Sequence, residues 1–457
     1  MHLPIDYIPK KVSILGAGRS GCAAAQFLGS KGVAVFISDA CSPEKLAEML
    51  AANQCGGFPI EAGGHTERVL DADVIVLSPG VPSDLPVLQK AKSRGVAVWS
   101  EIELAFRFSK GTYLAITGST GKSTTVSMLG SVLKAAGVEH IVAGNIGVPL
   151  VSTATKIGPT GFIAAEISSF QLENIDCFRP KVAVVLNLLK NHLDRYKNEE
   201  DYYNAKKAIA VNMGKNDHVV INHGDPLLAR WARQLDGRAS VVRFGSGAVP
   251  SDGVWYENGA LFSRFGGAQK HVLDVKSMRL RGRHNYENAC AAAATAHLAG
   301  INNEHIASGL TAFTGLEHRL EFVAEIDGIR YYNDSKSTTA ESILCAISAF
   351  EHNVHLIAGG RDKGCDFSIV KETIAKNVKS VCLIGEAAGR MAKLWNGCAP
   401  ISNAATLEEA VRGMHAKAEP GDVILFSPGC SSFDMFRNFE HRGEVFKKSV
   451  LQLPEKR

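Results

Sequence analysis

The chain has 457 residues, more than one hydrophobic core normally holds, so roughly two to four domains are expected. Its 46% apolar and 21% charged residues describe an ordinary soluble globular protein. The net charge of +4, with no run of five like charges and no apolar run of membrane-spanning length, points to neither a nucleic acid nor a membrane as a partner.

Short apolar runs rich in β-branched residues alternate with helical patterns along the chain. Continuous apolar strands separated by helices are typical of parallel sheets covered on both faces, so the predicted fold class is α/β. The stretch 242–282 predicts hairpins or an irregular connection instead. The predicted strands are residues 11–15, 33–38, 73–78, 113–117, 162–166, 182–187, 218–222, 354–359, 381–385 and 422–427.

Three units begin near Lys11, Tyr113 and Val354, each with a strand that leads into a glycine-containing turn. We therefore expect three domains, with boundaries near residues 100 and 315: 1–100, 101–315 and 316–457. The ten cysteines are scattered without C-x-x-C pairs, as expected for reduced thiols in a cytosol.

A glycine-rich turn follows the first predicted strand. Residues 16–21, GAGRSG, fit the pattern G-x-G-x-x-G, and the next predicted strand is followed by Asp39. Glycines at these places allow a tight turn and let a helix N-terminus approach a diphosphate. The pattern suits any nucleotide diphosphate, so an NAD(P)-dependent oxidoreductase and a purely structural turn both stay open at this point.

A second loop, TGSTGKST (117–124), resembles the end of a phosphate-binding loop. The common form G-x-x-x-x-G-K-[ST] requires glycine where this chain has Ile116. The loop nevertheless lies between a predicted strand and an apolar-striped helix, which is the context that such a loop needs. In such a loop backbone N–H groups surround the anion; here Lys122 would reach the outer phosphates and Ser123 would bind magnesium.

Further motifs follow in order, and with the loop they carry a resemblance. They are AGNIGVP (143–149), EISSFQLE (166–173), NHLDRY (191–196), GRHNYENACAA (282–292), GLEHRLE (315–321), YNDSKSTTAES (332–342), GGRDKGCDF (359–367) and FSPGCSSFDMFRNFEHRGEVF (426–446). From about Lys11 to Phe446 the sequence resembles the Mur ligases of peptidoglycan synthesis, most closely their glutamate-adding members. The phosphate loop of that family has the form T-G-[ST]-x-G-K-[ST]-[ST], without the early glycine.

The resemblance implies a Rossmann-like UDP-binding domain, a central ATPase domain of the P-loop type and a Rossmann-like C-terminal domain that binds glutamate. It implies an ATP-dependent amide ligase that adds D-glutamate to UDP-N-acetylmuramoyl-L-alanine through an acyl phosphate, as a cytoplasmic monomer. L-Glutamate as the substrate, another Mur ligase or a folate polyglutamate ligase are alternatives. An oxidoreductase or a sensor of UDP-sugar-peptides without turnover are more distant ones.

The family motifs assign ATP and magnesium to particular residues. A carboxylate after a buried strand, as at Glu166, needs a cation or a donor, although a helix cap would also satisfy it. Lys206 aligns with the lysine that carries a carbamate in the family; a solvated helix lysine is the alternative, and Lys207 lies next to it. The ATP site would comprise Gly118, Ser119, Thr120, Gly121, Lys122, Ser123, Thr124, Asn285, Asn288, Arg319, Asp334 and Lys336. Two magnesium ions would be held by Ser123, Glu166, His192 and Lys206, and the catalytic residues would be Lys122, Glu166, His192 and Lys206.

The remaining motif positions imply the two other substrate sites. Asn191 and Thr339 depart from the family, which usually has aspartate and asparagine there. The UDP-linked substrate would contact Gly18, Arg19, Ser20, Asp39, Ser78, Gly80, Asn145, Ser168 and Gln171. Glutamate would contact Thr338, Lys363, Ser432 and Phe439.

Overall fold

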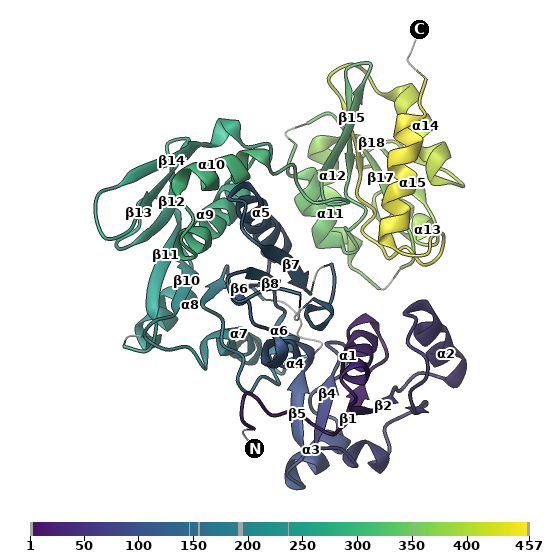
Figure 1. Cartoon of the computed structure of the whole chain (residues 1–457). Helices are drawn as coiled ribbons and strands as arrows, with labels where there is room; N and C mark the ends of the chain where they lie inside the picture. The colour runs from purple at the N-terminus through teal and green to yellow at the C-terminus, as the bar shows by residue number, and fades with distance from the viewer. Residues whose placement is uncertain are drawn as a thin grey trace. The chain divides into compact units, whose positions relative to one another are not determined.

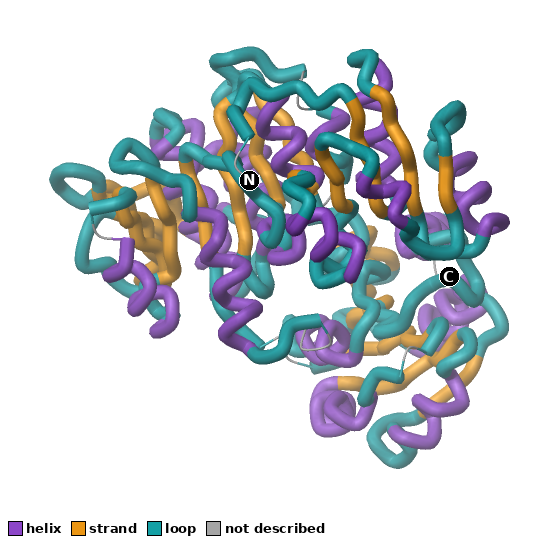
Figure 2. The backbone as a smooth tube through the Cα atoms, turned by 90° about the horizontal axis from the view of Figure 1, so that it is seen from below, coloured by secondary structure: helices purple, strands orange, loops and turns teal. Residues whose placement is uncertain are grey.

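A computed structural model describes residues 3–145, 147–153, 156–190, 195–235, 237–350, 352–362 and 364–454. Two compact units divide the chain, residues 1–313 and 314–457 (Figure 1). Strands and helices alternate in both units, and helices flank the sheets (Figure 2). The predicted α/β class is thereby confirmed, whereas the predicted boundaries near 100 and 315 stay predictions.

The first unit opens with a parallel sheet of the order β3-β2-β1-β4-β5. Alternate side chains of its strands point to opposite faces, so Val12 and Ile14 pack in the core beneath α1, and Leu15 packs with Leu88 of α3. Its elements are β1 (Lys11–Leu15), α1 (Arg19–Ser30), β2 (Ala34–Ser38), α2 (Pro43–Ala52), β3 (Ile60–Glu61), β4 (Val74–Leu77), α3 (Pro86–Ser93) and β5 (Ala97–Ser100).

A second sheet in the same unit has the order β14-β13-β12-β11-β10-β9-β6-β8-β7. Its strands run parallel from β7 to β12, and β12, β13 and β14 are joined antiparallel, as the hairpin prediction for 242–282 expected. Its strands are β6 (Thr112–Thr117), β7 (His140–Gly144), β8 (Phe162–Glu166), β9 (Val182–Val185), β10 (His218–Asn222), β11 (Ser240–Ser246), β12 (Gly253–Glu257), β13 (Ala260–Arg264) and β14 (Lys270–Asp274).

Helices cover both faces of this second sheet. One face carries α5, α9 and α10, which pack side by side (Figure 1). On the other face a core continues from Ala115 and Val185 through Tyr202 of α7 to Val12 and Ile14 of the first sheet, so one core spans both sheets of the unit. The helices are α4 (Glu101–Phe108), α5 (Lys122–Ala135), α6 (Ser169–Leu172), α7 (Glu199–Lys207), α8 (Pro226–Ala232), α9 (Arg283–Leu298) and α10 (Asn303–Ala312).

The unit 314–457 is built around a sheet of the order β15-β16-β20-β17-β18-β19, parallel except for the hairpin β15–β16. Leu356 faces the core beneath α11, α12 and α13, and its neighbour Ile357 faces the core beneath α14 and α15. Its elements are β15 (Glu321–Ile326), β16 (Ile329–Asn333), α11 (Ala340–Ile347), β17 (Val354–Gly359), α12 (Lys371–Asn377), β18 (Val378–Ile384), α13 (Ala388–Leu394), β19 (Ile401–Asn403), α14 (Leu407–Lys417), β20 (Val423–Phe426) and α15 (Phe439–Leu451).

Every strand predicted from the sequence is present, with its ends shifted by a few residues at most. None of the helices in the described residues combines the length and the hydropathy that crossing a membrane requires.

Candidate active site at the carboxyl edge of the second sheet

Three neighbouring strands place polar groups at one edge of the second sheet. Strand β6 lies between β8 and β9, and all three are parallel, so their carboxyl ends meet at the same edge. The phosphate loop follows β6, Glu166 ends β8, and Asn187 comes two residues after β9. Ligands of open α/β sheets bind beyond the carboxyl ends of the strands, so this edge is the candidate active site.

Two glycines give the phosphate loop its shape. Gly118 and Gly121 have φ angles of 150° and 82°, which side chains other than glycine rarely adopt. A Cβ atom on Gly118 would lie 2.9 Å from Leu186 Cβ, and one on Gly121 would lie 2.5 Å from Asn288 Oδ1. The Thr125 N–H donates to Gly121 O at 2.9 Å, so the first turn of α5 ends the loop with N–H groups directed out of the helix, as an anion site requires.

Lys122 and the two residues after it begin α5 directly at the loop. Lys122 Nζ donates hydrogen bonds to Gly118 O at 2.8 Å and to Ser119 O at 3.1 Å. Ser123 and Thr124 are buried in the first helical turn. The predicted phosphate and magnesium groups of the loop are therefore gathered within one turn of backbone.

Asn187 is a residue of this site that the sequence analysis missed. Its Oδ1 accepts hydrogen bonds from the N–H groups of Ser119, at 3.0 Å, and Thr120, at 2.9 Å, and its Nδ2 donates to Thr120 O at 3.3 Å. Ser119 Oγ also donates to Leu189 O at 2.9 Å. The segment after β9 therefore holds Ser119 and Thr120, the first half of the loop.

Lys206 reaches the same loop from α7. It is 2% exposed, and its Nζ donates to Gly118 O at 2.9 Å. The Nζ also lies 4.6 Å from the centre of the Tyr202 ring. Burial, together with the positive charge of Lys122, lowers the pKa of Lys206 to about 6, and Glu166 opposes the shift. Near pH 7 the amine is therefore largely neutral.

Glu166 supplies a carboxylate that is only half satisfied. The residue is 2% exposed, and its Oε1 accepts a hydrogen bond from Asn145 Nδ2 at 3.0 Å. Its Oε2 is buried without a hydrogen-bond partner in the part of the chain that the structure describes. An unpaired buried carboxylate oxygen is costly, and an oxygen donor of this kind suits a magnesium ion. The residues therefore fit the predicted metal, although His192 lies outside the described residues.

The predicted residues for the acyl end of the UDP-linked substrate lie beside Glu166. The Asn145 N–H donates to Glu166 O at 2.9 Å. Ser168 and Gln171 form a capping box at α6, in which Ser168 N donates to Gln171 Oε1 at 3.0 Å. These three side chains therefore surround the end of β8.

Two residues that were predicted to contact the UDP-linked substrate, Asp39 and Ser78, hold the glycine-rich turn of the first sheet in place. Asp39 accepts hydrogen bonds from the N–H groups of Ala17, at 2.7 Å, and Cys41, at 2.9 Å. Burial alone would raise the pKa of Asp39, but these donors bring it below its usual value. Ser78 Oγ donates to Gly16 O at 2.8 Å. The other residues predicted for the UDP-linked substrate in this sheet also follow strand ends: Gly18, Arg19 and Ser20 follow β1, and Gly80 follows β4.

The turn and the second sheet are linked by Arg19, whose guanidinium donates to Gly147 O in the segment after Asn145. At the phosphate loop, Asn288 of α9 lies against Gly121. Asn285, one helical turn earlier, donates from Nδ2 to Arg281 O at 2.8 Å. The described residues of the first unit that were predicted for the site thus lie at or near the carboxyl ends of its strands, at the end of α7 and at the start of α9.

The other predicted ATP and glutamate residues belong to the unit 314–457. Asp334 is buried; it accepts from Ser427 Oγ at 2.8 Å and Leu320 N at 3.2 Å, and burial raises its pKa to about 7. Lys336 Nζ lies 5.7 Å from the centre of the Phe439 ring. Arg319, Thr338 and Ser432 lie in the same unit, with Ser432 buried, and Lys363 lies outside the described residues. The approach of these residues to ATP stays a prediction.

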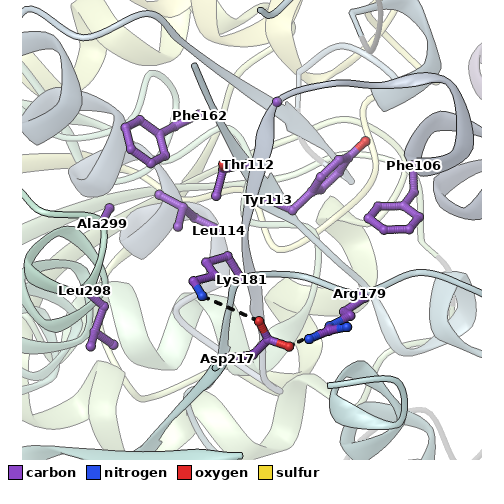
Figure 3. Close-up of a pocket in the computed structure, with 11 residues that line it drawn as sticks. Phe106, Thr112, Tyr113, Leu114, Phe162, Arg179, Lys181, Asp217, Leu298 and Ala299 are labelled. Atoms are coloured by element: carbon purple, nitrogen blue, oxygen red, sulfur yellow. Dashed lines mark hydrogen bonds and ion pairs between the residues drawn. The ribbon is translucent and has the colours of Figure 1, made fainter. Parts of the chain in front are cut away.

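A pocket of about 400 Å³ lies at the opposite, amino edge of the second sheet (Figure 3). Thr112 and Phe162, which begin β6 and β8, line it. Arg179 and Lys181 both point to Asp217 there; Arg179 Nε donates at 2.6 Å and Lys181 Nζ lies at 3.8 Å. Both cations are engaged by the one carboxylate of Asp217, and the phosphate loop is at the other end of the strands, so we do not assign ATP to this pocket.

Comparisons with known proteins agree with this arrangement. Three family models match the chain: the Mur ligase MurD-like N-terminal domain at residues 10–100, the Mur ligase middle domain at 116–296 and the Mur ligase glutamate ligase domain at 318–430. The chain belongs to the Mur ligase family.

Curated relatives show which members of the Mur ligase family this chain is similar to. A protein of Acidobacterium capsulatum is 42% identical over 97% of this chain and 96% of its own length. A protein of Pelotomaculum thermopropionicum is 40% identical over 98% of this chain and 99% of its own length. Both are named UDP-N-acetylmuramoylalanine–D-glutamate ligase, which confirms the predicted resemblance to the glutamate-adding Mur ligases.

Solved structures of other Mur ligases share the fold. The UDP-N-acetylmuramate-alanine ligase MurC of Thermotoga maritima matches with a TM-score of 0.60 at 19% identity, over 97% of this chain and 99% of that one. MurF of Acinetobacter baumannii matches with a TM-score of 0.62 at 17% identity, over 96% of this chain and 93% of that one. The predicted three-part architecture is confirmed by this likeness and by the three family models.

Asn187→Ala tests the support of the phosphate loop. Loss of the amide frees the N–H groups of Ser119 and Thr120, so we expect the KM for ATP to rise about tenfold or more, since net hydrogen bonds contribute about 1 kcal/mol each. Steady-state kinetics with ATP varied would measure it.

The matched control is Asn212→Ala. Asn212 Nδ2 also donates to two backbone carbonyls, Asp176 O at 2.8 Å and Phe178 O at 3.1 Å, away from the loop. An equal rise of the KM for ATP in both variants would show a general loss of stability instead of a role for Asn187 in the loop.

Proposed function

We propose that this Mur ligase joins D-glutamate to UDP-N-acetylmuramoyl-L-alanine at the expense of ATP, in the synthesis of peptidoglycan precursors. The observation that carries the proposal is the meeting of the phosphate loop, Glu166 and Lys206 at one sheet edge, in a chain that matches D-glutamate ligases over its whole length. The ten cysteines are free thiols, which supports a reducing cytoplasm as the compartment.

The reaction needs two displacements. In the first, an oxygen of the alanyl carboxylate attacks the γ-phosphorus of ATP, and the bond to the β–γ bridging oxygen breaks to release ADP. In the second, the amine of glutamate attacks the acyl carbon, the C–O bond to phosphate breaks, and the amine loses its proton. Positioning and charge stabilisation supply most of the catalysis in phosphoryl transfer.

Residues at the carboxyl edge of the second sheet would each have a part in these steps. The N-terminal turn of α5 would bind the phosphates. Lys122, whose Nζ lies 2.8 Å from Gly118 O, would extend from the loop to the outer phosphate oxygens. Two magnesium ions, held by Ser123, Glu166, His192 and Lys206, would neutralise the anionic reactants when bound. Asn285 and Asn288 would lie on the nucleoside side of the loop.

The UDP-linked substrate would lie across the two sheets of the first unit. Its diphosphate would face the turn that contains Gly18, and its carboxylate would face Asn145 and Glu166. Arg19, which donates to Gly147 O, lies between these two places. Glutamate would be held in the other unit by Thr338, Lys363, Ser432 and the backbone of Phe439. We propose that the chain acts as a monomer.

Lys206 would act as a carbamate. The amine is buried, its Nζ hydrogen bond goes to the neutral Gly118 O, and no carboxylate lies within ion-pair distance of it among the described residues. Carbon dioxide reacts with the neutral amine, and the product loses a proton. The low pKa, caused by burial, provides that neutral form near pH 7. The carbamate would replace a cation that repels metal with an anionic oxygen ligand.

The proposed reaction is tested by phosphate release from ATP in the presence of UDP-N-acetylmuramoyl-L-alanine with D- or L-glutamate. We expect release that depends on both co-substrates and on the D isomer. Faster release with the L isomer would favour the L-glutamate alternative, and release that does not depend on the UDP-linked substrate would contradict the proposal.

Lys122→Ala tests the role of the loop lysine. Removal of the ammonium takes away a charge that would stabilise the transferred phosphoryl group, so we expect kcat to fall by about 100-fold or more. Binding of the UDP-linked substrate, measured by calorimetry, should stay near the wild-type value. Turnover at the wild-type rate would rule out this role for Lys122.

Lys206→Ala tests the carbamate. We expect activity to fall by about 100-fold, the cost typical of a lost metal-site group, and a small carboxylic acid in the buffer to restore part of it by filling the vacated space. Lys206→Arg should stay inactive, because a guanidinium keeps its charge and takes up no carbon dioxide. Full activity of Lys206→Arg would refute the carbamate and direct attention to Lys207.

A further inference from the structure

Arg195 lies at the meeting point of three segments that are far apart in the sequence. It belongs to the motif NHLDRY, and no role in the site has so far been assigned to it. Its NH1 donates to Pro79 O and its NH2 to Val81 O, each at 3.1 Å, in the loop after β4. Its NH2 also donates to Glu173 Oε2 at 3.1 Å, and its guanidinium lies 4.1 Å from the centre of the Phe170 ring.

Glu173 fixes this guanidinium in place. It receives a second donor, Tyr196 OH, on Oε1 at 2.6 Å, and a third, Ser83 Oγ, on Oε2. The side chains of Arg195 and Glu173 are 19% and 16% exposed, so solvent screens their pairing less than that of a surface ion pair. Ser83 Oγ accepts in turn from Asn174 Nδ2 at 2.9 Å. The loop 79–83 is thus bonded at several points to the end of α6.

The joined segments are those on which the two ends of the UDP-linked substrate would rest. The loop 79–81 directly follows Ser78, whose Oγ donates to Gly16 O in the glycine-rich turn. Phe170 lies in α6, between the capping residues Ser168 and Gln171 near the end of β8. Arg195 therefore bridges the nucleotide side and the acyl side of the proposed substrate site.

We propose that Arg195 is a positioning residue for the UDP-linked substrate, because it fixes the loop 79–81 of the first sheet against α6 of the second. The inference rests on the proposed function. A substrate held at both ends binds tightly only if the two places keep their separation, whereas ATP, held at the loop 118–124, does not depend on it. A planar guanidinium reaches two carbonyls and a carboxylate at once, which a lysine ammonium on a flexible stem does not reproduce.

The test compares Arg195→Met, Arg195→Lys and Glu173→Gln with the wild-type chain. We expect the KM for UDP-N-acetylmuramoyl-L-alanine to rise about tenfold or more in all three variants, because each loses charge-assisted hydrogen bonds that hold the loop 79–81 against α6. The KM for ATP should change less than about twofold, because the loop 118–124 keeps its own contacts. The double variant Arg195→Met/Glu173→Gln should be no worse than the poorer single one, since the two side chains act as a pair.

Arg179→Met is the matched control. Arg179 also pairs with a carboxylate, Asp217 at 2.6 Å, but at the amino edge of the second sheet (Figure 3). We expect its KM for the UDP-linked substrate to match the wild type. A rise equal to that of Arg195→Met would overturn the proposal, because it would show a general effect of losing an ion pair.

Calorimetric binding of the UDP-linked substrate separates the remaining outcomes. Wild-type affinity in Arg195→Met or in Arg195→Lys overturns the positioning role and leaves the proposed function intact. A wild-type chain that neither binds nor turns over this substrate overturns both. Should Arg195→Met fail to fold, as judged by its thermal transition, Arg195→Lys and Glu173→Gln decide the question on the same criteria.

Discussion

The candidate site depends on the pairing of β6 between β8 and β9. Because all three strands are parallel, this pairing brings together the ends of segments that lie up to 70 residues apart in the chain (from 117 to 187): the loop after Thr117, the carboxylate of Glu166 and the amide of Asn187. A shift of register by one residue would turn every side chain of a strand to the opposite face. The hydrophobic strands therefore fix the chemistry of this edge as well as the core.

Polar groups buried at this edge are costly for the fold. The buried Lys206 and the half-buried Lys122 donate to the same oxygen, Gly118 O, and the buried Glu166 keeps one oxygen unpaired among the described residues. Burial of such groups lowers stability unless a ligand or a counter-ion meets them. A site that binds a polyphosphate with its metal ions supplies those partners, so the cost in the ligand-free chain agrees with the proposed function. Functional sites are where local rules of stability are commonly broken.

The sequence predicted most of the fold because the strands are continuous apolar runs. The runs YLAIT, FIAA and VAVV are such strands, and a glycine-rich turn after YLAIT supports that interpretation further. Strands that were not predicted include β5 (Ala97–Ser100), which runs directly into α4, and β7 (His140–Gly144), whose polar first residue and glycine end leave a short apolar run. Short apolar runs of this kind are ambiguous between strand and helix. The strands β3, β15, β16 and β19 were not predicted either.

The site was predictable to the extent that its motifs are local. The phosphate loop and the glycine-rich turn are contiguous in the sequence, and the structure forms both at carboxyl ends of strands. Asn187 was missed because its partners lie 67 and 68 residues away. A polar residue soon after a buried strand was the available signal. The contacts of Arg195 with Pro79 and Val81 span more than 110 residues, and no pattern within its motif indicates them.

A crystal soaked with ADP and Mn²⁺ would test the assignment of this edge most directly, since the anomalous signal of manganese locates the metal without reference to activity. The account predicts nucleotide phosphates at the first turn of α5 and a manganese peak within bonding distance of Glu166 Oε2 and Ser123 Oγ. Phosphates bound at the amino edge, beside Arg179 and Lys181, or a metal that leaves Glu166 unliganded, would contradict it.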